Sequence, residues 1–248
     1  MSSDLSMSFV LGRAPVIPVL AIERLEQAVP LARALVSGGL PVLEITLRTP
    51  VALSAVEVIA RDVPEALPGV GTYVRAEQAR AARDAGARFL VSPGLTAGVL
   101  AGAEAAALPL LPGIATASEL MQALDAGIRH CKFFPAEASG GVAALRALHG
   151  PFAEARFCPT GGIGADNYLD YLALPNVLCV GGSWVAPADA LASADWERIG
   201  NLAAAVSGRR RLEAGGVTGG SRDAPGAVDD WYSVAGEEDP GSADEALR

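Results

Sequence analysis

The sequence predicts an α/β fold built on a parallel sheet, and three observations lead to this prediction. Short runs rich in leucine and β-branched residues alternate with alanine-rich segments of helical periodicity through most of the chain. Glycine follows several of these segments, at Gly38, Gly86 and Gly127, where helices commonly end. The chain has 248 residues, 51% of them hydrophobic, which is enough for one large core.

Eight segments have the composition of buried strands. In chain order they are Val16 to Ala21, Val42 to Leu47, Leu67 to Gly71, Phe89 to Ser92, Leu108 to Pro112, His130 to Phe133, Arg156 to Pro159 and Val177 to Gly181. Eight parallel strands with intervening helices favour a closed (β/α)8 TIM barrel, and an open doubly wound sheet is the second possibility.

Seven helices are predicted between these strands from their alanine-rich apolar periodicity. They are Leu25 to Val36, Val51 to Ile59, Ala76 to Ala85, Ala97 to Ala106, Ser118 to Ala126, Val142 to Leu148 and Asn167 to Leu174. Helices between strands at this spacing allow every strand to run in the same direction, as a parallel sheet requires.

The end of the chain differs from the rest in composition. Residues 213–248 are rich in Gly, Ser, Asp and Glu and contain nine acidic and two basic residues, so they carry −7 of the net charge of −9. Such a composition cannot bury enough apolar surface to fold. We therefore expect a folded domain over residues 1–212 and a disordered acidic tail over residues 213–248. The nearly neutral domain has no basic stripe, which argues against a nucleic acid partner.

Other classes of protein are also disfavoured. No apolar run is long enough to span a bilayer, and the first twelve residues lack a signal-peptide pattern, so we expect a cytoplasmic protein without a membrane partner. The three cysteines are odd in number and widely spaced in apolar segments, which indicates buried free thiols. With only two histidines in the chain, a His-rich metal site is not expected.

Lys132 is the only lysine in the chain, and the other 18 basic residues are arginine. It lies in a predicted strand between Cys131 and Phe133, which is an apolar setting. A lysine removed from water can become a free amine, whereas arginine keeps its proton in proteins. A free amine can attack a ketone and form a Schiff base. The other interpretation is a lysine whose aliphatic stem covers apolar surface while its ammonium reaches water.

Glu44 is expected to face the same interior as Lys132. Apolar residues alternate with Glu44 and Thr46 in the second predicted strand, and the apolar side must pack against helices, so Glu44 points inward. The same period points Lys132 inward from the sixth strand, which lies opposite in an eight-strand barrel. The pair could be a structural ion pair, which contributes little stability because burial costs both charges their hydration. Schiff-base chemistry needs a proton shuttle beside the amine, and this interpretation is favoured.

Two glycine pairs follow the last two predicted strands. Gly161 and Gly162 come after Thr160, and Gly181 and Gly182 precede Ser183. Glycine lets the backbone approach a ligand closely, and exposed amides at a helix start bind phosphate. Tight turns also need glycine, but the loops after strands seven and eight commonly bind phosphate in barrels. Both pairs together therefore predict a phosphate site.

Two charged residues lie near the predicted pair in sequence. Arg48 directly follows the strand of Glu44, where it could bind a substrate carboxylate or cap the loop at the surface. Glu137 competes with Glu44 as a base, but it lies in the loop beyond Pro135.

Five motifs resemble those of the bacterial 2-keto-3-deoxy-6-phosphogluconate (KDPG) aldolases, which also act on 4-hydroxy-2-oxoglutarate (KHG). These motifs are Leu43-Glu44-Ile45-Thr46-Leu47-Arg48-Thr49, Ser92-Pro93-Gly94-Leu95-Thr96, Lys132-Phe133-Phe134-Pro135-Ala136-Glu137, Arg156-Phe157-Cys158-Pro159-Thr160-Gly161-Gly162-Ile163 and Gly181-Gly182-Ser183-Trp184. The resemblance covers the chain from about Ala14 to Val206.

The resemblance implies a homotrimeric class I aldolase of the Entner–Doudoroff pathway of carbohydrate metabolism that needs no metal or other cofactor. It implies that Lys132 forms the Schiff base and that Glu44 moves protons. The implied substrate-binding residues are Arg48, Thr72 and Pro93 at the pyruvyl end, Phe134 beside the lysine, Thr160 at the substrate hydroxyl, and Gly161, Gly162, Gly182 and Ser183 at the phosphate.

One departure concerns the end of the third strand. The family pattern would place Val after Thr72 with Asn close by, but this chain has Tyr73-Val74-Arg75, which leaves the fine substrate preference open. The sequence therefore predicts a lyase that cleaves KDPG to pyruvate and D-glyceraldehyde 3-phosphate, and also KHG to pyruvate and glyoxylate. The alternatives are an enzyme acting mainly on KHG, or a non-catalytic barrel that binds a phosphorylated metabolite and signals through the acidic tail.

Overall fold

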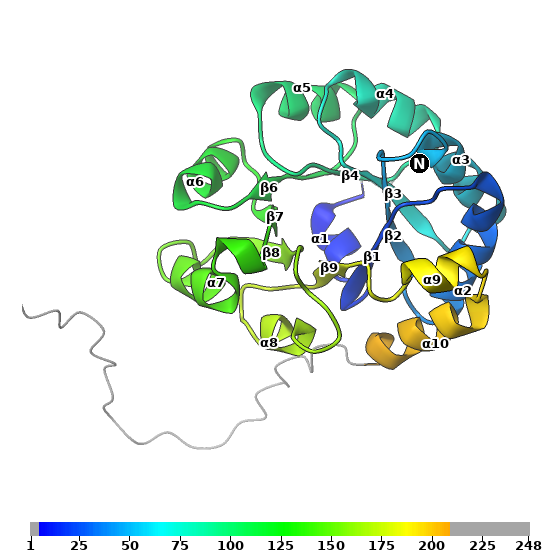
Figure 1. Ribbon diagram of the computed structural model, residues 1–248. Helices are drawn as coiled ribbons and strands as arrows, with labels where there is room; N and C mark the ends of the chain where they lie inside the picture. Colours follow the sequence, from blue (N-terminus) through cyan, green and yellow to red (C-terminus); the bar gives the residue numbers. More distant parts are fainter. Residues whose placement is uncertain (1–4, 209–248) are drawn as a thin grey trace, which may run out of the picture. The chain divides into compact units, whose positions relative to one another are not determined.

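The computed structural model describes residues 5–208 (Figure 1), so the predicted acidic tail, residues 213–248, lies outside the described residues. The strands are β1 (Val16–Leu20), β2 (Val42–Thr46), β3 (Leu67–Gly71), β4 (Leu90–Val91), β5 (Leu110–Leu111), β6 (Gly113–Ile114), β7 (His130–Phe133), β8 (Arg156–Pro159) and β9 (Val180–Gly182). The helices are α1 (Met7–Leu11), η1 (Leu25–Gln27), α2 (Ala28–Ser37), α3 (Ala52–Asp62), α4 (Glu77–Asp84), α5 (Ala97–Ala105), α6 (Ala117–Asp125), η2 (Glu137–Ser139), α7 (Gly141–His149), α8 (Tyr168–Leu172), α9 (Ala188–Ala192) and α10 (Trp196–Ser207).

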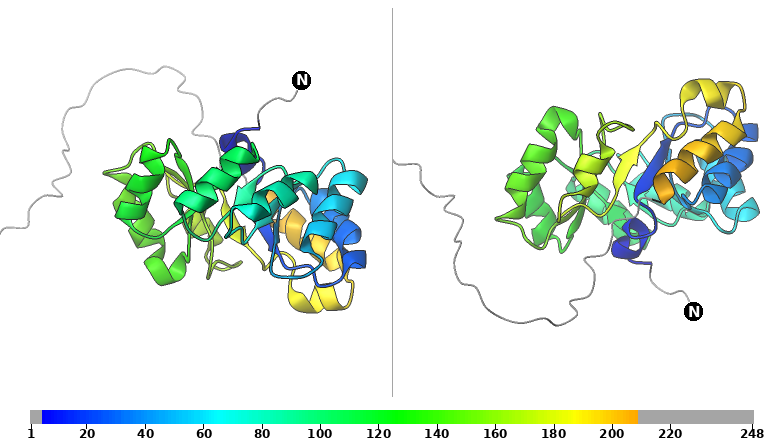
Figure 2. Two further views of the ribbon diagram at one scale, coloured as in Figure 1. Left: turned by 90° about the horizontal axis from the view of Figure 1, so that it is seen from above. Right: turned by 90° about the horizontal axis from the view of Figure 1, so that it is seen from below.

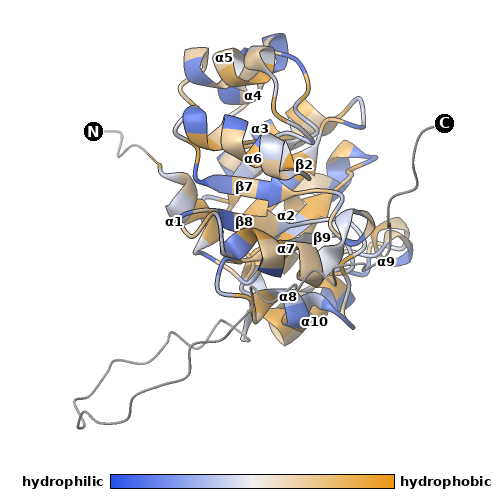
Figure 3. Ribbon diagram, turned by 90° about the vertical axis from the view of Figure 1, so that its left-hand side faces the viewer, coloured by the Kyte–Doolittle hydropathy of each residue, from blue (hydrophilic) through white to orange (hydrophobic). Residues whose placement is uncertain are grey.

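The strands form a curled parallel sheet with helices on its outer side (Figures 1 and 2). One run of paired strands has the order β5-β4-β3-β2-β1-β9, and a second has the order β6-β7-β8. Pro112 separates β5 from β6, and it has no N–H to donate to a neighbouring strand. The prediction of an α/β fold with parallel strands is confirmed. Figure 3 shows hydrophilic and hydrophobic segments side by side on the surrounding helices, as expected for helices that cover a sheet.

Two groups of buried apolar side chains hold this arrangement together. The larger group lies between the strands and the helices and includes Leu43, Ile45 and Phe133. The smaller group has contributions from Ile17, Val42, Phe89 and Cys179 and also contains Met7, Val10 and Leu11 of α1. In β2, Leu43 and Ile45 belong to the larger group and Val42 to the smaller one, because successive side chains of a strand point to opposite sides of the sheet. Helix α1 thus packs against the inner side of the sheet (Figure 1).

Glycines on the strands leave room for the polar residues of the inner side. A Cβ atom on Gly71 of β3 would lie 2.4 Å from Oε1 of Glu44. A Cβ atom on Gly181 of β9 would lie 2.3 Å from Oγ1 of Thr160. Both separations are too short for real atoms, so a larger residue at either position would displace a polar side chain that the sequence assigns to the site.

The predicted and observed elements differ mainly at the ends of the chain. Strand β9 starts at Val180 instead of Val177, because Val177 makes only one isolated bridge, to Phe157. Helices α1, α9 and α10 were not predicted. Helix α10 packs closely on α2. A Cβ atom on Gly38, at the end of α2, would lie 2.4 Å from Cβ of Ala203 in α10. Among residues 5–208, no helix combines the length and the apolarity needed to cross a membrane.

Candidate active site

Lys132 of β7 and Glu44 of β2 meet on the inner side of the sheet. The Nζ atom of Lys132 donates a hydrogen bond of 3.1 Å to Oε1 of Glu44. Their side chains are only 8% and 4% exposed. The inward direction predicted for both residues is therefore confirmed, although they are 88 positions apart in the chain. The lysine does not extend to the surface.

Phe134 and Cys158 lie beside Lys132. The ring of Phe134 lies with its centroid 5.2 Å from Nζ of Lys132, close enough for a cation–π contact. Cys158 is the register partner of Lys132 on β8 and is buried. Cys131, which precedes Lys132 on β7, belongs to the larger apolar group on the outer side of the sheet, and burial there raises the pKa of its thiol to about 12. Two opposite charges interact strongly when buried, and removal of either partner would leave the other buried without compensation.

Arg48 is anchored to the strand that carries Glu44. The hydroxyl of Thr46 donates 2.8 Å to the carbonyl of Leu20 on β1, and Nε of Arg48 donates 3.1 Å to the same hydroxyl oxygen. Thr46 was not among the predicted site residues, although the alternation that placed Glu44 inward also placed Thr46 there. This contact leaves the terminal guanidinium nitrogens of Arg48 free to reach an anion beyond the strand end.

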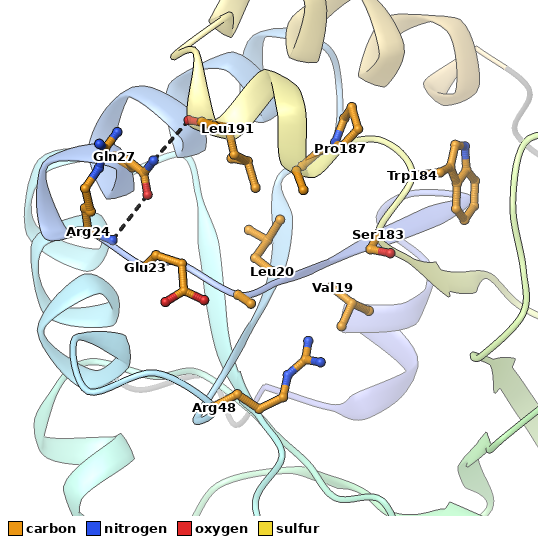
Figure 4. A pocket seen from close by; sticks show the side chains of 14 residues that line it. Val19, Leu20, Glu23, Arg24, Gln27, Arg48, Ser183, Trp184, Pro187 and Leu191 are labelled. Carbon is orange, nitrogen blue, oxygen red and sulfur yellow. Dashed lines mark hydrogen bonds between the residues drawn. The ribbon is translucent and has the colours of Figure 1, made fainter.

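A pocket of about 650 Å³ opens beside Arg48, between the loop after β1 and the loop after β9 (Figure 4). Arg48 and Ser183 line it together with the apolar side chains of Leu20 and Trp184. Gln27 stiffens its wall, because its side-chain amide donates 3.0 Å to the carbonyl of Leu191. Neither Lys132 nor Glu44 lines this pocket.

Two more predicted residues lie at the ends of strands near the pair. Thr72 follows β3 and has a φ of 57°, a left-handed conformation that is uncommon for a residue with a β-carbon. Pro93 follows β4, and its carbonyl oxygen would lie 2.2 Å from a Cβ atom on Gly113. Gly113 is the register partner of Lys132. The backbone at Pro93 therefore packs against the strand beside the lysine.

At Tyr73 the chain departs from the family pattern, and the structure shows that this residue packs in the core. Tyr73 is fully buried, and its hydroxyl donates 2.9 Å to the carbonyl of Val99 in α5. Val74 and Arg75 are exposed. Tyr73 thus ties the loop after β3 to the helix that follows Pro93.

The loop after β8 lies against the loop that follows the lysine strand. The amide of Ala136 donates 2.8 Å to the carbonyl of Thr160, and the amide of Glu137 donates 3.1 Å to the carbonyl of Gly161. Thr160 is buried, and Gly161 and Gly162 have φ angles of 101° and 78°, which favour glycine.

The second glycine pair ends the last strand of the sheet. Gly182 of β9 is buried, and a Cβ atom there would collide with the ring of Trp184 at 1.8 Å. Ser183 is exposed at the edge of the pocket (Figure 4). An isolated bridge between Thr160 and Gly181 brings the two glycine pairs next to each other.

Glu137, the competing base, is engaged elsewhere. Its Oε1 accepts a hydrogen bond from the hydroxyl of Tyr171 on α8, while the hydrogen bond from Lys132 goes to Glu44. Tyr171 had no signal in the sequence that would connect it to the site. Within residues 5–208, no three His, Cys, Asp or Glu side chains are grouped as metal ligands.

Known proteins share both the sequence and the fold of this chain. The family model described as "KDPG and KHG aldolase" matches residues 7–202. The KHG/KDPG aldolase of Escherichia coli strain K12 is 54% identical over 198 residues, which cover 80% of this chain and 93% of that protein. The 2-dehydro-3-deoxy-phosphogluconate aldolase of Dickeya dadantii is 56% identical over 194 residues, which cover 78% of this chain and 91% of that protein.

A crystal structure is similar as well. The KDPG aldolase of Legionella pneumophila, solved with pyruvate captured as a covalent carbinolamine intermediate, is 49% identical with a TM-score of 0.79, covering 81% of this chain and 97% of that one. The match of the family model over most of the chain and the identity to these relatives show that this chain belongs to the KDPG and KHG aldolase family.

Proposed function

We propose that this protein is a class I aldolase that cleaves KDPG to pyruvate and D-glyceraldehyde 3-phosphate. The observation that carries the proposal is the buried hydrogen bond of 3.1 Å between the sole lysine and Glu44. This bond joins an amine and a carboxylate, the two groups that Schiff-base chemistry needs, in an almost fully buried position. The relatives named for this reaction support the same conclusion.

The reaction begins when Glu44 takes a proton from the ammonium of Lys132 along their hydrogen bond. The amine adds to the C2 ketone of the substrate, and Glu44 gives the proton it has taken to the C2 hydroxyl, which leaves as water and gives a protonated imine. This iminium withdraws electrons as the C3–C4 bond breaks, while Glu44 removes the proton of the C4 hydroxyl. Glyceraldehyde 3-phosphate leaves, and an enamine of pyruvate remains. Glu44 then gives the proton it took from the C4 hydroxyl to C3, and water hydrolyses the protonated imine to release pyruvate and the ammonium of Lys132.

The other site residues have binding roles in this proposal. Arg48 binds the substrate carboxylate at the pyruvyl end, where Thr72 and Pro93 complete the contact. Phe134 packs beside the reacting carbon, and Thr160 binds a substrate hydroxyl. The amides of Gly161, Gly162 and Gly182 and the hydroxyl of Ser183 bind the phosphate. The support is their placement around the ion pair and in the two neighbouring glycine loops.

KHG is a second substrate in this proposal. It has the same 2-keto acid head as KDPG but no phosphate, so it needs Lys132, Glu44 and Arg48 and depends less on the glycine loops. The E. coli relative is named for both substrates. A non-catalytic barrel that only binds a phosphorylated metabolite would leave the buried lysine–carboxylate pair without a role.

We also propose the assembly and the complete architecture. Isolated bridges from Phe157 to Val177 and from Thr160 to Gly181 support closure of the sheet into a (β/α)8 barrel. The homotrimer follows from the family alone.

A cytoplasmic location fits the three cysteines, all of which are buried and form no disulfide. The domain boundary at residue 212 and a disordered tail remain proposals from composition.

Borohydride reduction in the presence of pyruvate is expected to inactivate the enzyme and to attach one pyruvate-derived group to Lys132. Digestion and mass spectrometry locate the group, and only the N-terminal amine competes because the chain has no other lysine. Lys132→Arg should be inactive and unlabelled, since a guanidinium keeps the charge but is no amine nucleophile. Complete inactivation with an unmodified Lys132 would disprove the mechanism.

Glu44→Gln should still bind pyruvate but should lose turnover by about 10²–10⁴-fold, because the amide cannot carry the proton. The measurement is kcat for pyruvate release from KDPG. Glu57→Gln is the matched control, since Glu57 is exposed on α3. Turnover close to that of the unaltered enzyme would assign the proton transfer to water or to Glu137.

Ser183→Ala should raise KM for KDPG by about tenfold and leave KM for KHG unchanged, because a hydrogen bond to a charged group is lost only with the phosphorylated substrate. Ser183 is a better test than Gly162, where any Cβ atom would lie 2.5 Å from Cγ of Glu137 and would disturb the loop itself. An equal change of both KM values would argue against phosphate binding at Ser183.

A further inference from the structure

Glu137 and Tyr171 are joined by a hydrogen bond outside the proposed catalytic machinery. Glu137 begins η2, five residues after Lys132, and Tyr171 belongs to α8. The Tyr171 hydroxyl donates to Oε1 of Glu137. Tyr171 is fully buried, and its burial, reinforced by the carboxylate, raises the pKa of the phenol. The hydroxyl therefore keeps its proton over the physiological range and remains a donor to Glu137.

The aliphatic part of Glu137 lies directly on Gly162. A Cβ atom on Gly162 would be 2.5 Å from Cγ and 2.7 Å from Cβ of Glu137. No residue with a side chain could occupy position 162 without displacing Glu137. The backbone amide of Glu137 also donates 3.1 Å to the carbonyl of Gly161. Both the backbone and the side chain of Glu137 thus support the turn formed by Gly161 and Gly162.

The far side of the same loop is held by Asn167. Its Nδ2 donates 3.1 Å to the carbonyl of Gly162, and its Oδ1 accepts 2.9 Å from the amide of Gly164. Asn167 directly precedes α8, which carries Tyr171. The glycine turn is therefore held from one side by Glu137 and from the other by the start of α8, and the bond from Tyr171 to Glu137 connects the two supports.

The charge of Glu137 makes the placement of its carboxylate important. A free carboxylate beside the glycine turn would repel an anion bound there. The bond from Tyr171 holds the carboxylate on α8, while the methylene groups remain on Gly162. A cavity lined by Glu137, Asn167, Asp170 and Tyr171 lies next to this contact.

We propose that Glu137 and Tyr171 form a positioning pair that fixes the Gly161–Gly162 turn in the conformation that accepts phosphate, and so favours the phosphorylated substrate. The inference rests on the proposed aldolase function. Neither residue touches the reacting atoms. Their role is to orient the backbone amides of the turn and to keep a negative charge away from them.

Tyr171→Phe tests this pair, because it removes one hydroxyl and leaves the ring. We expect KM for KDPG to rise about tenfold, with KM for KHG and both kcat values within about twofold of the unaltered enzyme. Glu137→Gln should retain most of the affinity of the unaltered enzyme for KDPG, since the amide oxygen still accepts from Tyr171. Glu137→Ala should also raise KM for KDPG, but by less than Tyr171→Phe, because it removes the support of the turn without leaving a free carboxylate there, and the double variant should be no worse than Tyr171→Phe.

Tyr73→Phe is the matched control, since it also removes one buried hydroxyl, whose bond goes to Val99. It should leave the ratio of the two KM values unchanged. An unchanged ratio in both Tyr171→Phe and Glu137→Ala would refute the positioning pair, as would an equal rise of KM for both substrates. An unaltered enzyme that turns over neither substrate would refute the proposed function and this inference with it. Because Glu137 is exposed, its variants remain testable even if Tyr171→Phe does not fold.

Discussion

The buried hydrogen bond between Lys132 and Glu44 is the interaction on which the rest of the site depends. Removing two charges from water costs more than a structural ion pair commonly returns, so the pair is a poor device for stability. The fold nevertheless provides space for it: Gly71 leaves a gap that the Glu44 side chain fills. A purely structural interior could fill that space with apolar side chains, whereas Schiff-base chemistry requires both groups.

The loops at the strand ends supply the groups that bind the carboxylate and the phosphate of the substrate in the proposed reaction. Arg48 provides a positive charge at the end of β2, held in place through Thr46. The loops after β8 and β9 provide glycine backbone that a phosphate can approach, and the bridge from Thr160 to Gly181 places them side by side. In this account the inner side of the sheet carries the chemistry, and the loops distinguish a phosphorylated substrate from an unphosphorylated one.

Much of the fold and the central pair could be predicted from the sequence, because strand alternation decides which side chains face inward. That rule placed Glu44 and Lys132 together across 88 residues. Helix α1 was missed because five residues are too short for a periodic signal. Helix α10 does carry apolar residues at helical spacing, Ile199, Ala203 and Val206, which could have revealed it. The bond of Tyr171 to Glu137 depends on tertiary packing, which no local pattern encodes.

The roles of Lys132 and Glu44 can be tested in a crystal of the enzyme soaked with pyruvate. We expect continuous electron density from Nζ of Lys132 to C2 of pyruvate. We also expect the Glu44 carboxylate within hydrogen-bonding distance of the adduct and the pyruvate carboxylate on Arg48. Pyruvate bound without a covalent link, with the hydrogen bond between Lys132 and Glu44 intact, would contradict the assignment of this pair as nucleophile and proton carrier.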